Sequence, residues 1–192
     1  MDKNKFQIFC DLDGVLVDLM DGINDAIYNE APENASNRYK NAQLAAREAL
    51  GGKKLQERDA NKNSEHFKKP VRNFMYRVMP DNRHFWMNLK WQPGGKELWS
   101  YIQKFNPKIL SRPVDLQSVI GKKKWVKDNL GLTGENVQIR FDKNEFANQN
   151  GKIGILIDDF QSNTIPFKES GGKAILYKNT RQTIEELKAL GF

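Results

Sequence analysis

The sequence predicts an α/β protein with a three-layer, Rossmann-like parallel sheet and an inserted helical cap. From residue 91 onward, short apolar runs alternate with helical patterns, which is the order that produces a parallel sheet covered on both faces. Residues 18–90 have helical spacing and no convincing strand. The 192 residues suffice for one hydrophobic core carrying a modest insertion.

The expected core contains five strands and three helices. The strands are the short apolar segments 6–11, 107–111, 136–141, 152–159 and 173–177. The helices are the amphipathic segments 94–105, 116–131 and 180–192, the last with Thr180 as its expected N-cap. We therefore assign residues 1–17 and 91–192 to the core.

Residues 18–90 are expected to form the helical cap, inserted after the first strand. Helices are predicted at 19–31 and 37–50, and the pair Gly51-Gly52 ends the second of them. A polar connector at 53–65 leads to a further helix at 66–78, which Pro70 either kinks or begins.

Composition indicates a soluble globular protein with anionic partners. Hydrophobic residues make up 39% of the chain and charged residues 29%. No apolar run approaches membrane-spanning length and no signal peptide is visible, so we expect a cytoplasmic protein. The formal charge of +7 favours nucleotides, nucleic acid or phosphorylated metabolites, although the lysines are widely spread. The one cysteine, Cys10, is expected to be a buried strand residue.

Polar side chains follow three of the predicted strands. Asp11 and Asp13 follow the first strand, Ser111 ends the second, and Asp158 and Asp159 end the fourth. In an open parallel sheet, ligands bind beyond the carboxyl ends of the strands. Each motif alone is typical of an ordinary turn, but their joint placement predicts one polar site.

The four carboxylates of this site would repel one another unless a hard cation binds among them. Carboxylates in small number, completed by waters and a substrate phosphate, suit Mg²⁺. We therefore expect metal ligands at Asp11, Asp13, Asp158 and Asp159. The lysines at 122, 123 and 124 are candidates for a cation that holds the phosphate.

The segments "DLDGVLVD", "ILSRP", "GKKKW" and "ILIDDF" resemble, in this order, the motifs of the haloacid dehalogenase-like (HAD) superfamily of phosphohydrolases. The resemblance covers essentially the whole core. Within the superfamily, the chain is most similar to the 5'(3')-deoxyribonucleotidases. This finer similarity rests on Asp18 and on the segments "HFWMNLKWQPGGKELW" and "KKKWVKDNLG".

The resemblance implies a role for each acid. Asp11 is expected to be the nucleophile that forms an aspartyl-phosphate. Asp13 is expected to protonate the leaving alcohol and then activate water, with its backbone carbonyl contacting the metal. Asp158 and Asp159 would supply direct and outer metal contacts, in an order left open, and Asn163 would orient one of them.

The resemblance also implies residues that bind the phosphate. Ser111 would donate a hydrogen bond to a phosphate oxygen, and Lys122 would hold the phosphate and the nucleophile, with Lys123 as the alternative. Arg112 departs from the family pattern and would contact the phosphate or another anion. Leu19 stands where the nucleotidases carry an aromatic residue, so this position offers no ring for base stacking.

Three cap aromatics are therefore alternative stacking residues. They are Phe85, Trp86 and Trp91, with Trp86 as our choice for substrate binding. The competing interpretation, that all three are buried packing residues, has equal weight.

The predicted function is a Mg²⁺-dependent phosphomonoester hydrolase that acts on (deoxy)nucleoside monophosphates through an aspartyl-phosphate. One alternative is a phosphatase of 3' or 5' nucleic-acid ends, which the positive charge favours; another is a phosphatase of a different small metabolite. A non-enzymatic module that binds phosphate or nucleic acid is disfavoured, because binding alone would not need both Asp11 and Asp13. No membrane partner is expected.

Overall fold

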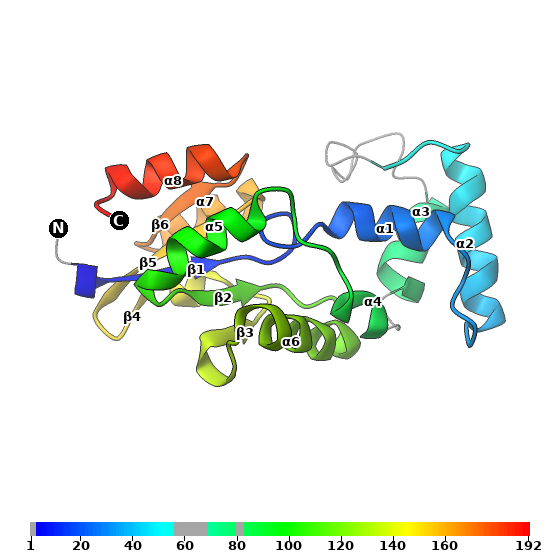
Figure 1. The fold of residues 1–192 in the computed structure, drawn as a ribbon, viewed down its shortest axis with the longest axis horizontal. Coiled ribbons are helices and arrows are strands. Elements are labelled where there is room, and N and C mark those ends of the chain that lie inside the picture. Colours follow the sequence, from blue (N-terminus) through cyan, green and yellow to red (C-terminus); the bar gives the residue numbers. More distant parts are fainter. Residues whose placement is uncertain (1–2, 56–68, 80–82) are drawn as a thin grey trace. The chain divides into compact units, whose positions relative to one another are not determined.

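The structure is a computed structural model that describes residues 3–55, 69–79 and 83–192 (Figure 1). Two compact units make up the chain. The sheet unit contains the chain up to Asp18, then Trp91–Pro113 and Val126–Phe192. The helical unit contains Leu19–Lys90 and Val114–Trp125. None of the described helices is both long and apolar enough to cross a membrane.

The described part of the sheet unit contains one six-stranded sheet, with helices on both faces. Its neighbouring strands follow the order β3-β2-β1-β5, and both β6 and the short β4 pair with β5. The strands are β1 (Phe6–Cys10), β2 (Lys108–Ser111), β3 (Val137–Ile139), β4 (Asn148–Gln149), β5 (Lys152–Asp158) and β6 (Lys173–Leu176). All five predicted strands are confirmed. Only β4, an unpredicted two-residue strand, runs antiparallel.

The parallel pairing of β1 and β5 places the acidic residues at their carboxyl ends next to each other. β1 and β5 are buried on both faces, as expected for parallel strands covered by helices. Cys10 lies opposite Ile157 of β5 and Ile109 of β2. Because the register is parallel, the next residues along, Asp11 and Asp158, leave their strands side by side.

Helices cover the two faces of the sheet. The helices of the sheet unit are α5 (Gly95–Ile102), α7 (Gln161–Glu169) and α8 (Thr180–Ala189), together with the last part of α6 (Leu116–Leu130). On one face, Phe167 of α7 packs in a cluster with Phe9, Leu110 and Leu156. Strand alternation turns the neighbouring residues to the opposite face. The sequence did not predict α7.

The N-cap prediction for α8 is wrong by one residue. Asn179 has extended backbone angles, and its side chain accepts a hydrogen bond from the N–H of Gln182. Thr180 is the first helical residue, and its hydroxyl instead donates to the carbonyl of Gly94 at 2.8 Å. Asn and Thr are both good capping residues, so sequence preference alone did not separate them.

Helix α6 belongs to both units. The sequence analysis placed all of it in the core, but Val114–Trp125 pack with the helical unit. The indole N–H of Trp125 donates to the carbonyl of Leu89 at 2.8 Å, and Gly121 allows close approach to Trp86. The helical unit therefore includes a segment that lies beyond the predicted boundary of 18–90.

The described helical unit is built from short helices around its own apolar core. They are α1 (Leu19–Tyr28), α2 (Asn37–Leu50), α3 (Lys69–Asn73), a π-helical turn (Phe74–Val78) and α4 (Arg83–Met87), together with the first part of α6. Helix α2 has its predicted bounds, with Ser36 as N-cap and Gly51 in the left-handed region. Pro70 is the second described residue of α3. The predicted connector 53–65 and the first residues of the predicted helix 66–78 fall mostly outside the described residues.

Candidate active site

A tight turn follows β1 and fixes the first two aspartates. The carbonyl of Leu12 accepts hydrogen bonds from the N–H groups of Val15, Leu16 and Val17 at 3.1, 2.8 and 2.8 Å. Val17 then pairs with Trp91, where the chain returns to the sheet unit. The backbone on either side of Asp13 is therefore held at the carboxyl edge of the sheet.

Gly14 is required in this turn for two reasons. Its φ of 73° lies in the left-handed region, which L side chains rarely adopt. In addition, a Cβ atom built at Gly14 would lie 2.3 Å from Oδ2 of Asp159. The missing side chain thus lets the turn after β1 approach the acidic end of β5.

Three carboxylates converge at this edge. Asp11, Asp158 and Asp159 each offer an oxygen atom, and these atoms all lie within 4.8 Å of one another. Asp11 is 6% exposed and Asp158 is fully buried. The parallel register of β1 and β5 thus brings together three of the four carboxylates that the sequence places in the site. Asp13 is not a member of this group, and its metal contact stays a prediction.

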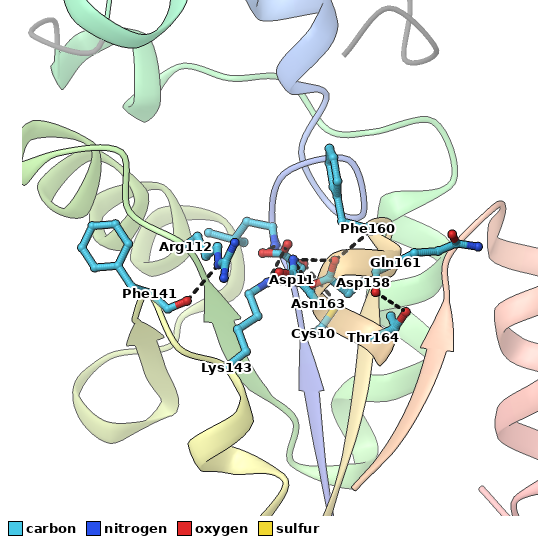
Figure 2. A network of polar contacts seen from close by, with 11 residues as sticks. Cys10, Asp11, Arg112, Phe141, Lys143, Asp158, Phe160, Gln161, Asn163 and Thr164 are labelled. Carbon is cyan, nitrogen blue, oxygen red and sulfur yellow. Dashed lines mark hydrogen bonds and ion pairs between the residues drawn. The ribbon is translucent and has the colours of Figure 1, made fainter. Parts of the chain in front are cut away.

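Lys143 is the cation of the cluster, and the sequence analysis missed it. Its Nζ atom lies 2.8 Å from Oδ2 of Asp11 and 2.6 Å from Oδ2 of Asp158 (Figure 2). Burial alone would lower the pKa of Lys143, but the two carboxylates outweigh it and raise that pKa above its ordinary value. Lys143 is therefore a fixed positive charge that links the expected nucleophile to an expected metal ligand.

Asp158 is held in place from several sides. Its Oδ1 accepts hydrogen bonds from the N–H of Phe160 at 2.9 Å and from Nδ2 of Asn163 at 3.0 Å. Asn163 also reaches Oδ2 at 3.0 Å, so this side chain does orient one member of the acidic pair. These contacts leave Asp158 a single orientation at the end of β5.

The electrostatics of the cluster suit a cation. Burial, followed by repulsion from Asp11, Asp158 and Asp13, raises the pKa of Asp159 to about 9. Burial and Asp11 likewise raise the pKa of Asp158 to about 6, although Lys143 opposes this shift. Oδ1 of Asp159 is buried and has no hydrogen-bond partner among the described residues. A divalent cation would satisfy this oxygen and relieve the repulsion.

Ser111 and Arg112 reach the same edge from β2. Ser111 is 1% exposed, and its carbonyl accepts a hydrogen bond from the N–H of Arg140 at 2.9 Å. Arg112 is exposed, and its Nε donates to the carbonyl of Phe141 at 2.8 Å. Their contacts with a phosphate or another anion stay predictions.

Lys122 and Trp86 belong to the helical unit. Lys122 is 2% exposed and its Nζ lies 5.0 Å from the centroid of the Trp86 ring, while Lys123 is exposed. Lys143 contacts Asp11 directly; the role of Lys122, or of Lys123, in holding the phosphate and the nucleophile stays a prediction. Trp86 is also 2% exposed, which fits the packing interpretation; its role toward a substrate stays a prediction.

Cys10 is a buried packing residue, as predicted. Its Sγ donates to the carbonyl of Asp11 at 3.4 Å. Burial raises the pKa of the thiol well above its ordinary value, with a further contribution from Asp11. A protonated, buried thiol is a poor nucleophile.

Comparison with known proteins supports the fold. No family model and no curated protein matches the sequence. A hydrolase from Streptococcus pneumoniae TIGR4 aligns with a TM-score of 0.55 and 14% identity, covering 96% of this chain and 99% of that one. The HAD-hydrolase YfnB from Bacillus subtilis, bound to magnesium, aligns with a TM-score of 0.50 and 13% identity, covering 88% and 86%. The chain therefore has the Rossmann-like α/β fold of HAD hydrolases.

Proposed function

We propose that this protein is a Mg²⁺-dependent phosphomonoester hydrolase with Asp11 as its nucleophile. The observation that carries the proposal is the buried Lys143, which pairs with Asp11 and Asp158 inside a cluster of three carboxylates. The HAD-hydrolase fold supports it, because the cluster lies where open α/β sheets bind ligands.

Asp11, Asp158 and Asp159 would hold the metal, with the backbone carbonyl of Asp13 as a further ligand that the family resemblance implies. The magnesium-bound Bacillus subtilis HAD-hydrolase of the same fold supports this choice of ion. When bound, Mg²⁺ would neutralise part of the negative charge on the substrate phosphate and the carboxylates.

The chemistry of the residues then follows in two steps. The Asp11 carboxylate attacks phosphorus, the ester P–O bond breaks, and Asp13 gives its proton to the leaving alcoholate. Water next attacks the aspartyl-phosphate and gives a proton to Asp13, which releases inorganic phosphate and restores Asp11. Lys143, whose Nζ lies 2.8 Å from Oδ2 of Asp11, stabilises charge on the transferring group.

We propose (deoxy)nucleoside monophosphates as the substrates. The sequence resemblance to 5'(3')-deoxyribonucleotidases supports this class, and the formal charge of +7 is compatible with an anionic ligand. In this proposal the protein acts in the cytoplasm on a small phosphorylated substrate.

A phosphate-release screen tests the function. It compares nucleotides, sugar phosphates and phosphorylated oligonucleotide ends, with Mg²⁺ or with a chelator. We expect release from mononucleotides that requires Mg²⁺ and is lost in Asp11→Asn. Release that persists in Asp11→Asn would refute the nucleophile. Faster release from oligonucleotide ends, falling steeply with salt, would instead favour the nucleic-acid alternative.

A further inference from the structure

Phe160 is an aromatic residue in an unusual place beside the carboxylates. It directly follows Asp158 and Asp159, and its side chain is 49% exposed. It also occupies the N-cap of α7, with φ −103° and ψ 123° and no side-chain capping bond. Phe160 therefore occupies a position that is both a helix N-cap and exposed to solvent.

Both features of this position disfavour phenylalanine. N-caps prefer Ser, Thr, Asp or Asn, because their side chains bond the unpaired N–H groups of the first turn. An exposed ring forgoes the stabilisation that burying it would give. A polar residue would serve the fold better on both counts, and such departures from local preference are expected at functional sites.

Other exposed apolar residues lack this combination. Ile165 on the same helix is 52% exposed, but it lies within the helix, away from the cap. Single exposed apolar side chains of this kind are ordinary. Exposure alone would therefore not single out Phe160.

A backbone hydrogen bond fixes the position of Phe160. The N–H of Phe160 donates to Oδ1 of the buried Asp158 at 2.9 Å, so the residue cannot shift without breaking a contact of the cluster. The ring projects beyond the carboxyl ends of the strands, clear of the polar network (Figure 2). A substrate whose phosphate reached Asp11 would have its remaining part on this side of the sheet.

Arg112 stands on the other flank of Asp11. It follows β2, Phe160 follows β5, and these two strands are the neighbours of β1 in the sheet. Its bond to the carbonyl of Phe141 ties the exposed guanidinium to the loop after β3. A guanidinium pairs well with a second phosphate because its planar fork matches two oxygens.

We propose that Phe160 and Arg112 select the leaving group of the reaction. Phe160 stacks on an aromatic base, and Arg112 pairs with a second negative charge beyond the reacting phosphate. The preferred substrate is then a phosphomonoester that carries both groups, from a nucleoside bisphosphate or from the end of an oligonucleotide. This inference rests on the proposed phosphatase activity.

The test measures kcat/KM for three substrates: glycerol phosphate, a nucleoside 5'-monophosphate and a nucleoside 3',5'-bisphosphate. Base stacking contributes about 1–3 kcal/mol, so Phe160→Ala should lower the ratio of kcat/KM for the nucleotide to kcat/KM for glycerol phosphate by about 5- to 150-fold. Phe160→Tyr should keep the ratio, and so should Ile165→Ala, the matched exposed control. Arg112→Gln should lower the preference for bisphosphate over monophosphate by about tenfold or more.

Phe160→Ser separates function from folding. It supplies a good N-cap, so its melting temperature should be equal to or above that of the wild type, while its preference for the aromatic substrate is lost. A ratio unchanged in both Phe160→Ala and Phe160→Ser would overturn the inference while leaving the phosphatase intact. Absence of release from every substrate by the wild type would instead remove the proposed function itself.

A phosphorylated dinucleotide distinguishes the two sources of the ligand. If the Phe160 variants lose more activity on its end than on the bisphosphate, nucleic-acid ends are the source. If the bisphosphate is affected equally or more, the ligand is a free nucleotide. Either result supports the stacking contact, and a loss no greater than that of Ile165→Ala on both substrates contradicts it.

Discussion

The two units both bury polar side chains, but they do so in opposite ways. In the helical unit, the Asn24 side chain accepts from the N–H of Leu55 at 2.8 Å and donates to its carbonyl at 2.9 Å. Gln43 likewise donates to the carbonyls of Ala26 and Asn29 at 2.7 and 3.0 Å. These side chains therefore provide hydrogen-bond partners for backbone groups of Leu55, Ala26 and Asn29.

In the sheet unit, buried acids face one another instead. Asp11 raises the pKa of both Asp158 and Asp159, and Lys143 compensates only part of the negative charge. Buried polar groups that are fully satisfied stabilise a fold, whereas buried like charges destabilise it. The difference indicates that the acidic cluster serves chemistry and the buried amides of the helical unit serve structure.

The largest expected effect distinguishes the two buried lysines. Lys143→Met removes the charge beside Asp11, so kcat should fall by about 10²–10³, as for loss of a transition-state donor. Lys122→Met removes a contact with Trp86 in the helical unit and should cost about 0.5–2 kcal/mol of unfolding free energy. Steady-state kinetics and urea unfolding measure both. If kcat fell further in Lys122→Met than in Lys143→Met, Lys122 and not Lys143 would be the catalytic lysine.

The pH dependence of stability tests the repulsion in the cluster. The folded metal-free protein keeps the Asp159 proton up to about pH 9, whereas the unfolded chain loses it near 3.8. The folded state therefore binds more protons between these values, and the free energy of unfolding should fall as pH rises. The slope should approach about 1.4 kcal/mol per pH unit for one proton. Asp159→Asn should flatten the curve of urea midpoints; an equally steep curve would contradict the assignment.

Two equally buried asparagines provide the next comparison. Asn24→Ala leaves the backbone of Leu55 unsatisfied, so unfolding free energy should fall by about 1–3 kcal/mol. Asn163→Ala removes two of the hydrogen bonds that orient the carboxylate of Asp158, so Mg²⁺ affinity should fall by about 10- to 100-fold. Calorimetric titration with Mg²⁺ measures the second effect. If Asn24→Ala weakened Mg²⁺ binding as much as Asn163→Ala does, the claim that Asn24 serves only the structure of the helical unit would be contradicted.

The smallest expected effect separates two glycines with positive φ. Gly51→Ala meets no atom within 4 Å, so it should cost only the backbone strain of about 1–2 kcal/mol. Gly14→Ala adds a collision with Asp159, so it should also weaken Mg²⁺ binding. Thermal unfolding with and without Mg²⁺ compares them. Equal stabilisation by Mg²⁺ in both variants would show that the turn after β1 does not position Asp159.

The sequence predicts the strands and three of the four cluster residues because each signal is local. An apolar run ending in an acid identifies the carboxyl edge at β1 and again at β5. Lys143 belongs to the segment "FDKNEF" after β3, which has no motif of its own. Lys143 does follow a strand, β3, and polar residues after parallel strands meet at one edge of the sheet. This is the signal that points to Lys143.

Other features depend on tertiary contacts that no local pattern shows. Helix α7 contains Pro166 and little amphipathic spacing, yet it forms because Phe167 is fully buried against the sheet. The first part of α6 has the pattern of an ordinary core helix, and its packing against Trp86 and Leu89 became visible only in the structure. In α7 packing overrides a weak helical pattern, whereas in α6 packing decides which unit the first part of a predicted helix joins.

The central claim is that the Asp11 carboxylate attacks phosphorus. The most direct test uses Asp13→Asn, which should slow hydrolysis of the intermediate, with Mg²⁺ and p-nitrophenyl phosphate, whose leaving group needs no proton. After an acid quench, mass spectrometry of the peptide that contains residues 11–13 should find one phosphoryl group on Asp11. Release of p-nitrophenol in a single turnover, with no phosphoryl group on Asp11, would contradict the account.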